Sequence, residues 1–209
     1  MQGKVVCLAS GGTDSPVASW LVVEKGLAPV FVYFDNAPFT DETAKQKALD
    51  TIKKLGLESA KVYVVSNGDN LADIVRNCPR NLTCVLCRRL MYRVAEKIAL
   101  KEDAEVLVTG EIIGEHASQT LRNLRVENQV LSEVTVLRPL IGMDKIEVEN
   151  MARKIGTFDV STRPGSCCTG APPKPRTRSG LEEVRKAEQH LNIKKMIEKD
   201  LKNTTILMV

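Results

Sequence analysis

The amino-acid sequence predicts an α/β fold in which helices cover both faces of a doubly wound parallel sheet. Short apolar runs rich in valine alternate along the chain with amphipathic stretches, and each run is apolar on both of its faces. Strands of this kind are typical of parallel sheets that are buried on both sides. Because crossovers between parallel strands are right-handed, we expect the first strand to lie near the centre of the sheet.

The expected elements follow one another as strand and helix. The strands are predicted over residues 4–9, 29–34, 61–65, 105–109 and 134–137. The helices are predicted over residues 16–25, 42–55, 71–77, 84–101 and 145–155. Prolines at positions 164, 172, 173 and 175 exclude regular structure over residues 163–179, because proline removes a backbone donor. A charged helix is expected over residues 181–202.

Length and composition indicate one globular domain, alone or with an appendage. The 209 residues are 43% hydrophobic and 27% charged, a balance that excludes intrinsic disorder. The longest apolar runs are far shorter than the ~18 residues that a membrane span requires. The N-terminus carries no apolar stretch of signal-peptide length, so we expect a cytoplasmic protein with no membrane partner.

The net charge of +4 comes from the C-terminal part of the chain. Residues 172–209 hold nine Lys or Arg residues against five acidic residues, which leaves residues 1–171 neutral. We therefore expect residues 172–209 to form a basic C-terminal extension that includes a helix. A basic segment fits a nucleic-acid partner and equally fits a solvated helix face, and the sequence leaves both interpretations open.

The strongest chemical signal is the turn Ser-Gly-Gly-Thr-Asp-Ser over residues 10–15, directly after the first strand. Gly11 and Gly12 allow the backbone to approach a ligand closely. Asp14 or Ser15 can cap the helix that follows, and Pro16 fits its first turn. The free N–H groups and the helix dipole then form an anion-binding site. The pattern matches neither the dinucleotide-binding nor the Walker glycine motif, and a plain strand–turn–helix connection is the alternative.

Six cysteines in a cytosolic chain favour metal binding or catalysis over disulfides. Cys7 lies in an apolar strand and is expected in the core. Cys84 and Cys87 form a C-x-x-C pair at the start of a predicted helix. The helix dipole, together with Arg88 and Arg89, is expected to lower the pKa of these two thiols.

A third ligand from a distant loop, Cys167 or Cys168, would complete a set of thiolates for an iron–sulfur cluster. Structural zinc, with Cys78 as a further ligand, is the competing use of the pair. A redox disulfide or free thiols are the third alternative. The two histidines, His116 and His190, are expected to be surface or packing residues, since neither belongs to a hydrolase pattern.

The turn at residues 10–15 resembles the pyrophosphate-binding loop of the PP-loop ATP pyrophosphatases, which split ATP into AMP and pyrophosphate. Further motifs in order narrow the resemblance to the catalytic domain of the tRNA 4-thiouridine synthetase (tRNA sulfurtransferase) family. These motifs begin at Cys84, Thr109, Ala117, Leu137, Ile155 and Cys167. The resemblance implies a Rossmann-like PP-loop ATPase fold of the adenine nucleotide alpha hydrolase type, with residues 1–171 as the ATP-binding catalytic domain.

The resemblance also implies roles for individual residues. The expected ATP-binding residues are Leu8, Ala9, Ser10, Gly11, Gly12, Asp14, Ser15, Tyr33, Phe34, Arg88, Gly110 and Gln119. Asp14 would serve the Mg²⁺–pyrophosphate, and Lys145 would offset the charge that develops on the phosphate. The catalytic thiol of the cluster-free relatives matches Cys167 or Cys168, and counting from neighbouring motifs does not decide between them.

The implied function is adenylation of a carbonyl oxygen by ATP and Mg²⁺, followed by its replacement with sulfur, and tRNA uridine giving 4-thiouridine is the expected substrate. The sequence contains no THUMP or rhodanese segment. A separate RNA-binding subunit and a separate sulfur donor are therefore expected, and a homodimer is compatible with the sequence. Adenylation or thiolation of a small-molecule or carrier-protein substrate is the second hypothesis. A non-catalytic ATP- or metal-binding subunit is the third.

Overall fold

The computed structural model describes residues 3–165 and 167–209, and within them the chain forms a six-stranded sheet flanked by helices. The strands are β1 (Lys4–Ala9), β2 (Ala28–Asp35), β3 (Lys61–Ser66), β4 (Val106–Val108), β5 (Thr135–Leu137) and β6 (Thr205–Met208). Their order in the sheet is β5-β4-β1-β2-β3-β6. All neighbours pair in parallel except β6, which runs antiparallel to β3. The predicted doubly wound fold with a central first strand is confirmed.

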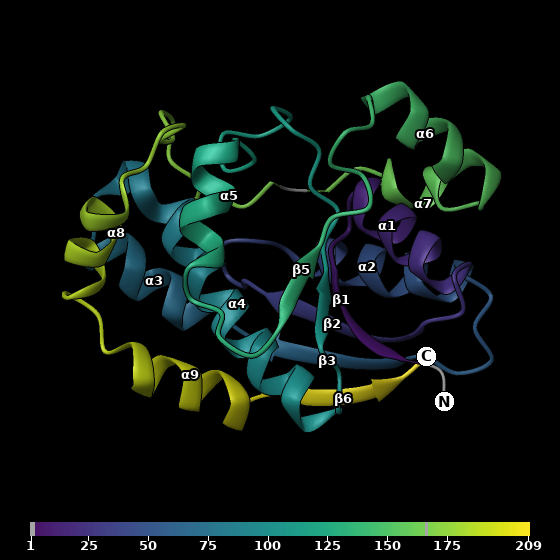
Figure 1. Ribbon diagram of the computed structural model, residues 1–209, viewed down its shortest axis with the longest axis horizontal. Coiled ribbons are helices and arrows are strands. Elements are labelled where there is room, and N and C mark those ends of the chain that lie inside the picture. Colours follow the sequence, from purple (N-terminus) through teal and green to yellow (C-terminus); the bar gives the residue numbers. More distant parts are fainter. Residues whose placement is uncertain (1–2, 166) are drawn as a thin grey trace.

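Helices cover the sheet in two layers (Figure 1). One layer contains α1 (Asp14–Val23), α2 (Glu42–Lys54), α6 (Lys145–Lys154) and α7 (Phe158–Ser161). The other layer contains α3 (Gly68–Asn77), η1 (Arg80–Leu82), α4 (Thr83–Lys101), α5 (Leu121–Asn128), α8 (Leu181–Glu188) and α9 (Ile193–Lys202). Each layer closes its own hydrophobic core against the sheet. Cys7 is fully buried in the core of the first layer, as predicted.

Several elements differ from the sequence-based expectation, among them the short η1 and α7, which were not predicted. The helix predicted over residues 181–202 is two helices, α8 and α9, because the side chain of Asn192 accepts a hydrogen bond from the Lys195 N–H and starts a new helix. Helix α5 was not predicted, and its first turn is capped by the Thr120 side chain. Strand β6 was not predicted either: its residues are largely apolar, but it forms by pairing with β3, a partner far along the chain.

The proline-rich segment lacks helix and strand in its described part, as predicted, but it is held firmly. We call residues 174–179 the strap. The Asn123 side chain, fully buried on α5, donates to the Arg176 carbonyl at 2.8 Å and accepts from the Ser179 N–H at 2.9 Å. The Arg176 N–H donates to the Asn81 carbonyl at 2.9 Å. The strap therefore crosses α5 and the turn before α4 along a fixed path.

No helix in the described ranges is both long and apolar enough to cross a bilayer.

Helix α8 is tied to α4 by ion pairs at Glu188. Its carboxylate lies 2.8 Å from the Arg89 guanidinium and 2.7 Å from that of Arg93. Burial alone would raise the pKa of Glu188, but the hydrogen bonds from Arg89 and Arg93 outweigh burial and lower it to about 2. The ordinary value is 4.5, so the ionised pair stabilises the fold fully above that value and progressively less as the pH falls toward 2.

We therefore expect Glu188→Gln to lower the free energy of unfolding near pH 7 by about 3 kcal/mol, because buried Arg89 loses its charged partner. The variant should also lose less stability than the wild type between about pH 5 and pH 2. Glu182→Gln is the control, since Glu182 pairs with Arg185 at an exposed site and should contribute less than about 0.5 kcal/mol. Urea denaturation across this pH range measures both effects, and identical pH profiles for Glu188→Gln and the wild type would contradict the prediction.

Candidate functional site

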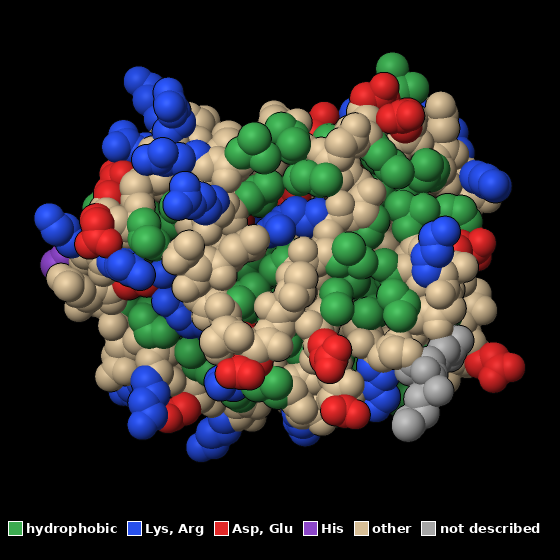
Figure 2. All heavy atoms as spheres, viewed as in Figure 1, with side chains coloured by type: hydrophobic (Ala, Val, Ile, Leu, Met, Phe, Trp, Pro, Cys, Tyr) green, Lys and Arg blue, Asp and Glu red, His purple; other side chains and the backbone are tan. Residues whose placement is uncertain are grey.

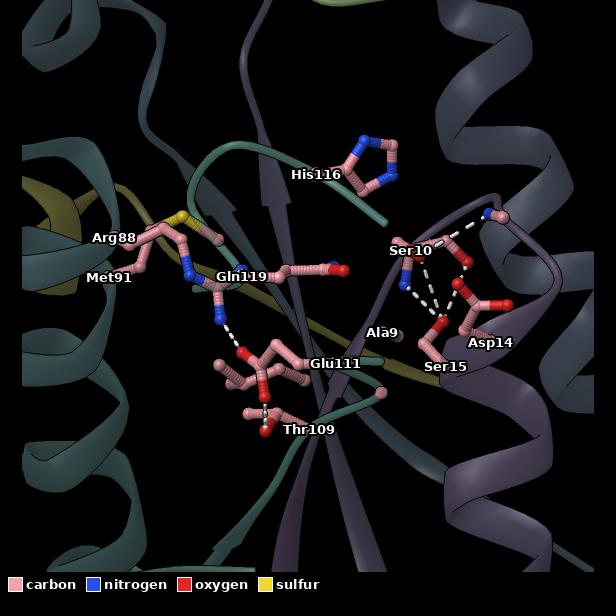
Figure 3. Close-up of a pocket in the computed structure, with 13 residues that line it drawn as sticks. Ala9, Ser10, Asp14, Ser15, Arg88, Met91, Thr109, Glu111, His116 and Gln119 are labelled. Carbon is pink, nitrogen blue, oxygen red and sulfur yellow. Dashed lines mark hydrogen bonds and ion pairs between the residues drawn. The ribbon is translucent and has the colours of Figure 1, made fainter. Parts of the chain in front are cut away.

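A cavity of about 230 Å³ lies at the carboxyl ends of β1 and β4 (Figure 3). In open α/β sheets this edge is where ligands bind. The lining residues come from β1 and its turn, from α4, and from the loop after β4. They are Leu8, Ala9, Ser10, Gly12, Asp14, Ser15, Arg88, Met91, Thr109, Gly110, Glu111, His116 and Gln119. Nine of the twelve residues expected from the sequence to bind ATP are among them.

The turn after β1 is organised by the hydroxyl of Ser15. This oxygen accepts from the Ser10 N–H at 2.9 Å and lies 3.0 Å from the Ser10 hydroxyl. Helix α1 begins at Asp14, and its N-cap residue Thr13 makes no side-chain capping bond. The expectation that Asp14 or Ser15 caps the helix is therefore wrong, because both side chains are engaged elsewhere. The first N–H groups of α1 thus meet no capping side chain, which suits anion binding.

Asp14 pairs instead with Lys145. The Lys145 Nζ lies 2.6 Å from Asp14 Oδ1, although the two residues are 131 positions apart in the chain. Lys145 is the first residue of α6, whose start is fixed by a capping box between Asp144 and Glu147. The structure therefore brings together the two residues that the sequence assigned to phosphate chemistry, and both remain partly accessible to a ligand.

Gly110 is the point of closest contact between β4 and α1. A Cβ atom at this position would lie 2.8 Å from the backbone C of Asp14 and 2.8 Å from the backbone N of Ser15. Such distances are too short for any side chain, so glycine is required here by the backbone of α1. The family resemblance placed Gly110 among the expected ATP-binding residues, and the packing against α1 is an additional reason for glycine at this position.

Arg88 is held beside the cavity by two buried carboxylates. Its guanidinium pairs with Glu111 and lies 3.0 Å from Glu127, and it donates to the Tyr92 hydroxyl at 3.1 Å. Arg138 pairs with Glu111 at 3.1 Å from the other side. Burial raises the pKa of Glu127, against the lowering effect of the Arg88 charge. The network fixes Arg88 at the cavity wall.

Gln119 lies at the opposite side of the cavity from Asp14, in a turn where its N–H donates to the His116 carbonyl at 2.8 Å. Its side chain is buried, and its Oε1 meets no donor within the described structure. An unpartnered amide oxygen facing a cavity is suited to accept a hydrogen bond from a ligand. His116, predicted as a surface or packing residue, is exposed and lies on the cavity rim.

Tyr33 and Phe34 do not line this cavity. Both lie at the end of β2, beside β1, and both are buried, Tyr33 in the core of one layer and Phe34 in that of the other. Gly11 lies in the turn, packed against α2, and is not a lining residue either. A nucleotide-binding role for these three residues stays a prediction.

The C-x-x-C pair lies in the first turns of α4. Cys87 is buried and Cys84 half-buried, and Cys168 packs half-buried against the same core while Cys167 is exposed. Cys168 is close enough for its charge to raise the pKa of both other thiols. Cys78 lies apart from them, and its thiol donates to the Ala187 carbonyl at 3.4 Å.

The expected lowering of the thiol pKa values is wrong. Burial raises the pKa of Cys84, and it raises that of Cys87 to about 12, while the Arg88 charge has a smaller, opposite effect. Within residues 3–165 and 167–209, no three His, Cys, Asp or Glu side chains converge closely enough to hold a metal ion. The donor types suit a metal or cluster, but their arrangement here does not form its ligand set.

Sequence reasoning missed Glu111, Glu127 and Arg138 as supports of the cavity. Glu111 and Arg138 stand in motifs that the sequence did single out, at residues 109–111 and 137–141, so a signal was available. Glu127 lies on α5, which the sequence did not predict.

Comparison with known proteins places the chain in a family and finds similar proteins and structures. The family model described as thiamine biosynthesis protein (ThiI) matches residues 1–193. A probable tRNA sulfurtransferase of Thermoanaerobacter sp. (strain X514) is 44% identical over 200 residues, which cover 94% of this chain and 52% of that protein. The chain spans about half the length of the curated relatives it matches.

Two solved structures are informative. A 4-thiouridine synthetase in complex with RNA and ATP has a TM-score of 0.93 at 36% identity, covering 99% of this chain and 55% of that one. The U34-tRNA thiolase NcsA from Methanococcus maripaludis, solved with its [4Fe-4S] cluster, has a TM-score of 0.58 at 17% identity. The match covers 96% of this chain and 71% of NcsA, and shows a shared fold.

The close contact at Gly110 can be tested by adding a single methyl group. We expect Gly110→Ala to lower the free energy of unfolding by about 1–3 kcal/mol, because the first turn of α1 must shift. Gly142→Ala is the matched control, since a Cβ there would meet nothing within 4 Å. Denaturation followed by the fluorescence of Trp20, the single tryptophan and a residue of α1, measures both variants. Equal stabilities for the two variants would show that the contact is not tight.

Proposed function

The chain belongs to the ThiI family, and on that premise we propose that it uses ATP to activate a carbonyl oxygen of tRNA and replaces that oxygen with sulfur. Conversion of uridine to 4-thiouridine is the proposed reaction. The names of the relatives support it, as does the similarity to a 4-thiouridine synthetase solved with RNA and ATP. The observation that carries the proposal is the Asp14–Lys145 pair beside an uncapped helix N-terminus at the carboxyl end of β1.

In this proposal the phosphate chain of ATP occupies the turn at residues 10–15. The N–H groups of the first turn of α1 and the Ser10 hydroxyl donate to phosphoryl oxygens. Asp14 would hold Mg²⁺, which would offset phosphate charge, and Lys145, the ion-pair partner of Asp14, would face the phosphate. The unpartnered Oε1 of Gln119 accepts a hydrogen bond from the adenine amino group, and Leu8 and Ala9 provide apolar contact.

The reaction then takes place in two steps. The carbonyl oxygen attacks the α-phosphorus of ATP, an O–P bond forms, and pyrophosphate leaves with the electrons of the broken P–O bond. Lys145 and the N–H groups of α1 stabilise the charge that develops on the leaving group. In the second step a sulfur nucleophile attacks the activated carbon, and AMP leaves with the original oxygen.

We further propose that Cys84, Cys87 and Cys168 serve the sulfur step, as ligands of an iron–sulfur cluster or, alternatively, of zinc. A cluster with three protein thiolates leaves one iron that can bind sulfide. Support comes from the proximity of the three thiols, since the charge of Cys168 raises the pKa of both Cys84 and Cys87. The placement of the pair at a helix start is further support. Within the described residues these three side chains do not converge into a metal-ligand set, so the two reaction steps need no cluster. In the alternative route the outer sulfur of a persulfide on the 167–168 segment attacks the activated carbon as AMP leaves, and a thiol of the Cys84–Cys87 pair then cleaves the S–S bond to give the thiolated product and a protein disulfide.

The RNA partner is proposed to bind along α5 and the strap. Exposed arginines and lysines gather over this end of the molecule (Figure 2). They include Arg80, Arg122, Arg125, Lys174, Arg176 and Arg178. The surface adjoins the cavity through the loop that carries Gln119, and a positive surface of this kind attracts the phosphate backbone. The basic segment expected from the sequence is thus joined by α5, which the sequence did not predict.

Asp14→Ala tests the proposed activity. We expect release of pyrophosphate from ATP in the presence of tRNA to fall at least about 100-fold, because the metal ligand is removed while no core volume is lost. Asp159→Ala, at an exposed position of α7, is the control and should retain wild-type turnover. Turnover by Asp14→Ala at the wild-type rate would contradict the proposal. Turnover by the wild type without RNA would favour a small-molecule substrate.

Arg122→Gln with Arg125→Gln tests the RNA surface. Loss of two phosphate contacts should weaken tRNA binding and reduce its logarithmic salt dependence by about two. Charge removal is preferable to truncation of the C-terminal part. Truncation would remove Val184 and Met196 from the hydrophobic core and would also remove strand β6 from the sheet. Lys53→Gln with Lys54→Gln, at the exposed end of α2, is the matched control. An unchanged salt slope in the arginine variant would place the RNA elsewhere.

Metal analysis tests the thiol site. After anaerobic reconstitution we expect bound iron and broad visible absorbance, both lost in Cys84→Ala and retained in Cys78→Ala, whose thiol points toward α8. Stoichiometric zinc without iron would favour a structural metal. Absence of both metals from the reconstituted protein would leave the persulfide route.

A further inference from the structure

The segment that carries Cys167 and Cys168 is anchored at its start by two side chains of α2. We call residues 163–165 and 167–169 the cysteine loop. The Lys47 Nζ donates to the Arg163 carbonyl at 2.9 Å, and the Arg163 guanidinium lies 3.0 Å from the Asp50 carboxylate. Two residues one helical turn apart on α2 therefore hold Arg163, one through its backbone and one through its side chain.

The other end of the cysteine loop is anchored by backbone and core packing. The Thr169 N–H and hydroxyl both donate to the Phe39 carbonyl, at 2.9 and 3.2 Å. A Cβ on the next residue, Gly170, would lie 3.0 Å from the Leu71 side chain and 3.3 Å from the Phe39 ring. This end is fixed independently of α2, and it sets Cys168 half-buried against the core.

Lys47 also contacts the turn at residues 10–15. A Cβ at Gly11 would lie 3.1 Å from Lys47 Cβ and 3.7 Å from Lys47 Cε, so the lysine stem runs along the turn. Among the described residues Lys47 forms no ion pair with a carboxylate, whereas its neighbour Lys45 pairs with Glu42. The ammonium group of Lys47 donates a hydrogen bond to the Arg163 carbonyl. The Lys47 side chain thus contacts both the phosphate-binding turn and the cysteine loop.

We propose that Lys47 is a positioning residue that holds the cysteine loop against the phosphate-binding turn, so that the outer sulfur of a persulfide on this loop can attack the activated carbon as AMP leaves. A thiol of the Cys84–Cys87 pair then cleaves the S–S bond, which leaves a protein disulfide and the thiolated product. The inference rests on the proposed function. It separates the two steps: formation of the adenylate depends on Asp14 and Lys145, whereas the transfer of sulfur depends on the distance between the turn and the loop. Loss of the Lys47 ammonium should therefore uncouple the steps while ATP still binds and reacts.

The variant Lys47→Met tests this separation, because it keeps the apolar stem beside Gly11 and removes the donor. We expect an unchanged KM for ATP and unchanged pyrophosphate release with tRNA. The amount of thiolated product per pyrophosphate should fall about tenfold, the effect expected for losing a charge-assisted hydrogen bond. Lys47→Arg, which can donate to the same carbonyl, should restore most of the coupling. Lys45→Met on the same helix is the matched control and should resemble the wild type.

A second measurement does not depend on the enzymatic activity. Iodoacetamide labelling of Cys168, located by tandem mass spectrometry, should be faster in Lys47→Met than in the wild type, because the start of the loop then keeps only the Arg163–Asp50 ion pair of its two anchors on α2. Labelling in Lys45→Met should match the wild type. A merely structural role of Lys47 would instead lower stability and change labelling of Cys84, Cys87 and Cys168 alike.

The outcomes separate this inference from the proposed function. A raised KM for ATP with unchanged coupling would assign Lys47 to the phosphates and overturn the inference. Unchanged coupling and unchanged labelling of Cys168 would overturn it as well. If the wild type releases no pyrophosphate and forms no thiolated product, the proposed function fails, and the role of Lys47 in sulfur transfer fails with it. Faster labelling in Lys47→Met would then still show that Lys47 fixes the loop.

Discussion

The site depends on the contact between Gly110 and the first turn of α1, where two backbones meet with no room for a side chain. This contact fixes the end of β4 against the first turn of α1 through main-chain atoms, which do not change with side-chain rotamers. It also sets the direction in which α1 starts, and thereby the position of Asp14 opposite Lys145 on α6. An anion-binding turn built in this way is preorganised before any ligand arrives, which is what stabilisation of a leaving phosphate requires.

Much of the fold could be predicted because its signal is local. Strands such as β1 and β2 are apolar on both faces, a pattern that distinguishes a buried parallel sheet from other arrangements. The elements that were missed depend on partners distant in sequence. Strand β6 forms only because it pairs with β3, and α5 owes its place to packing on α4 and to the buried Asn123 that holds the strap. Neither leaves a strong periodic pattern in its own few residues.

The site residues likewise divide into those with a local sequence signal and those that depend on partners distant in the chain. The turn at residues 10–15 and Lys145 could be identified from residue type and motif order, and the structure places them together. The supports of Arg88 were missed: Glu111 stands in a recognised motif, but its ion pair with Arg88 appears only in the packed chain, and Glu127 lies on α5, which was not predicted. The thiols illustrate a further limit: position at a helix start predicts a low pKa, but burial of Cys87 acts in the opposite direction and is the larger effect. Burial is a property of the packed molecule and is not visible in the spacing of cysteines.

The two layers of helices also explain why the cysteine loop is irregular. The turn at residues 10–15 contacts α2 and α7 in one layer, whereas Cys84 and Cys87 belong to α4 in the other. A chain segment that serves both must cross the carboxyl edge of the sheet, from Arg163 beside α2 to Arg176 beside α5. The described residues along this path form neither helix nor strand, because the prolines at positions 164, 172, 173 and 175 interrupt backbone hydrogen bonding. Prolines suit such a crossing, since they favour extended backbone and have no N–H that needs a partner. The prolines that excluded regular structure are thus what lets one segment carry a thiol from α2 in one helix layer to α5 in the other.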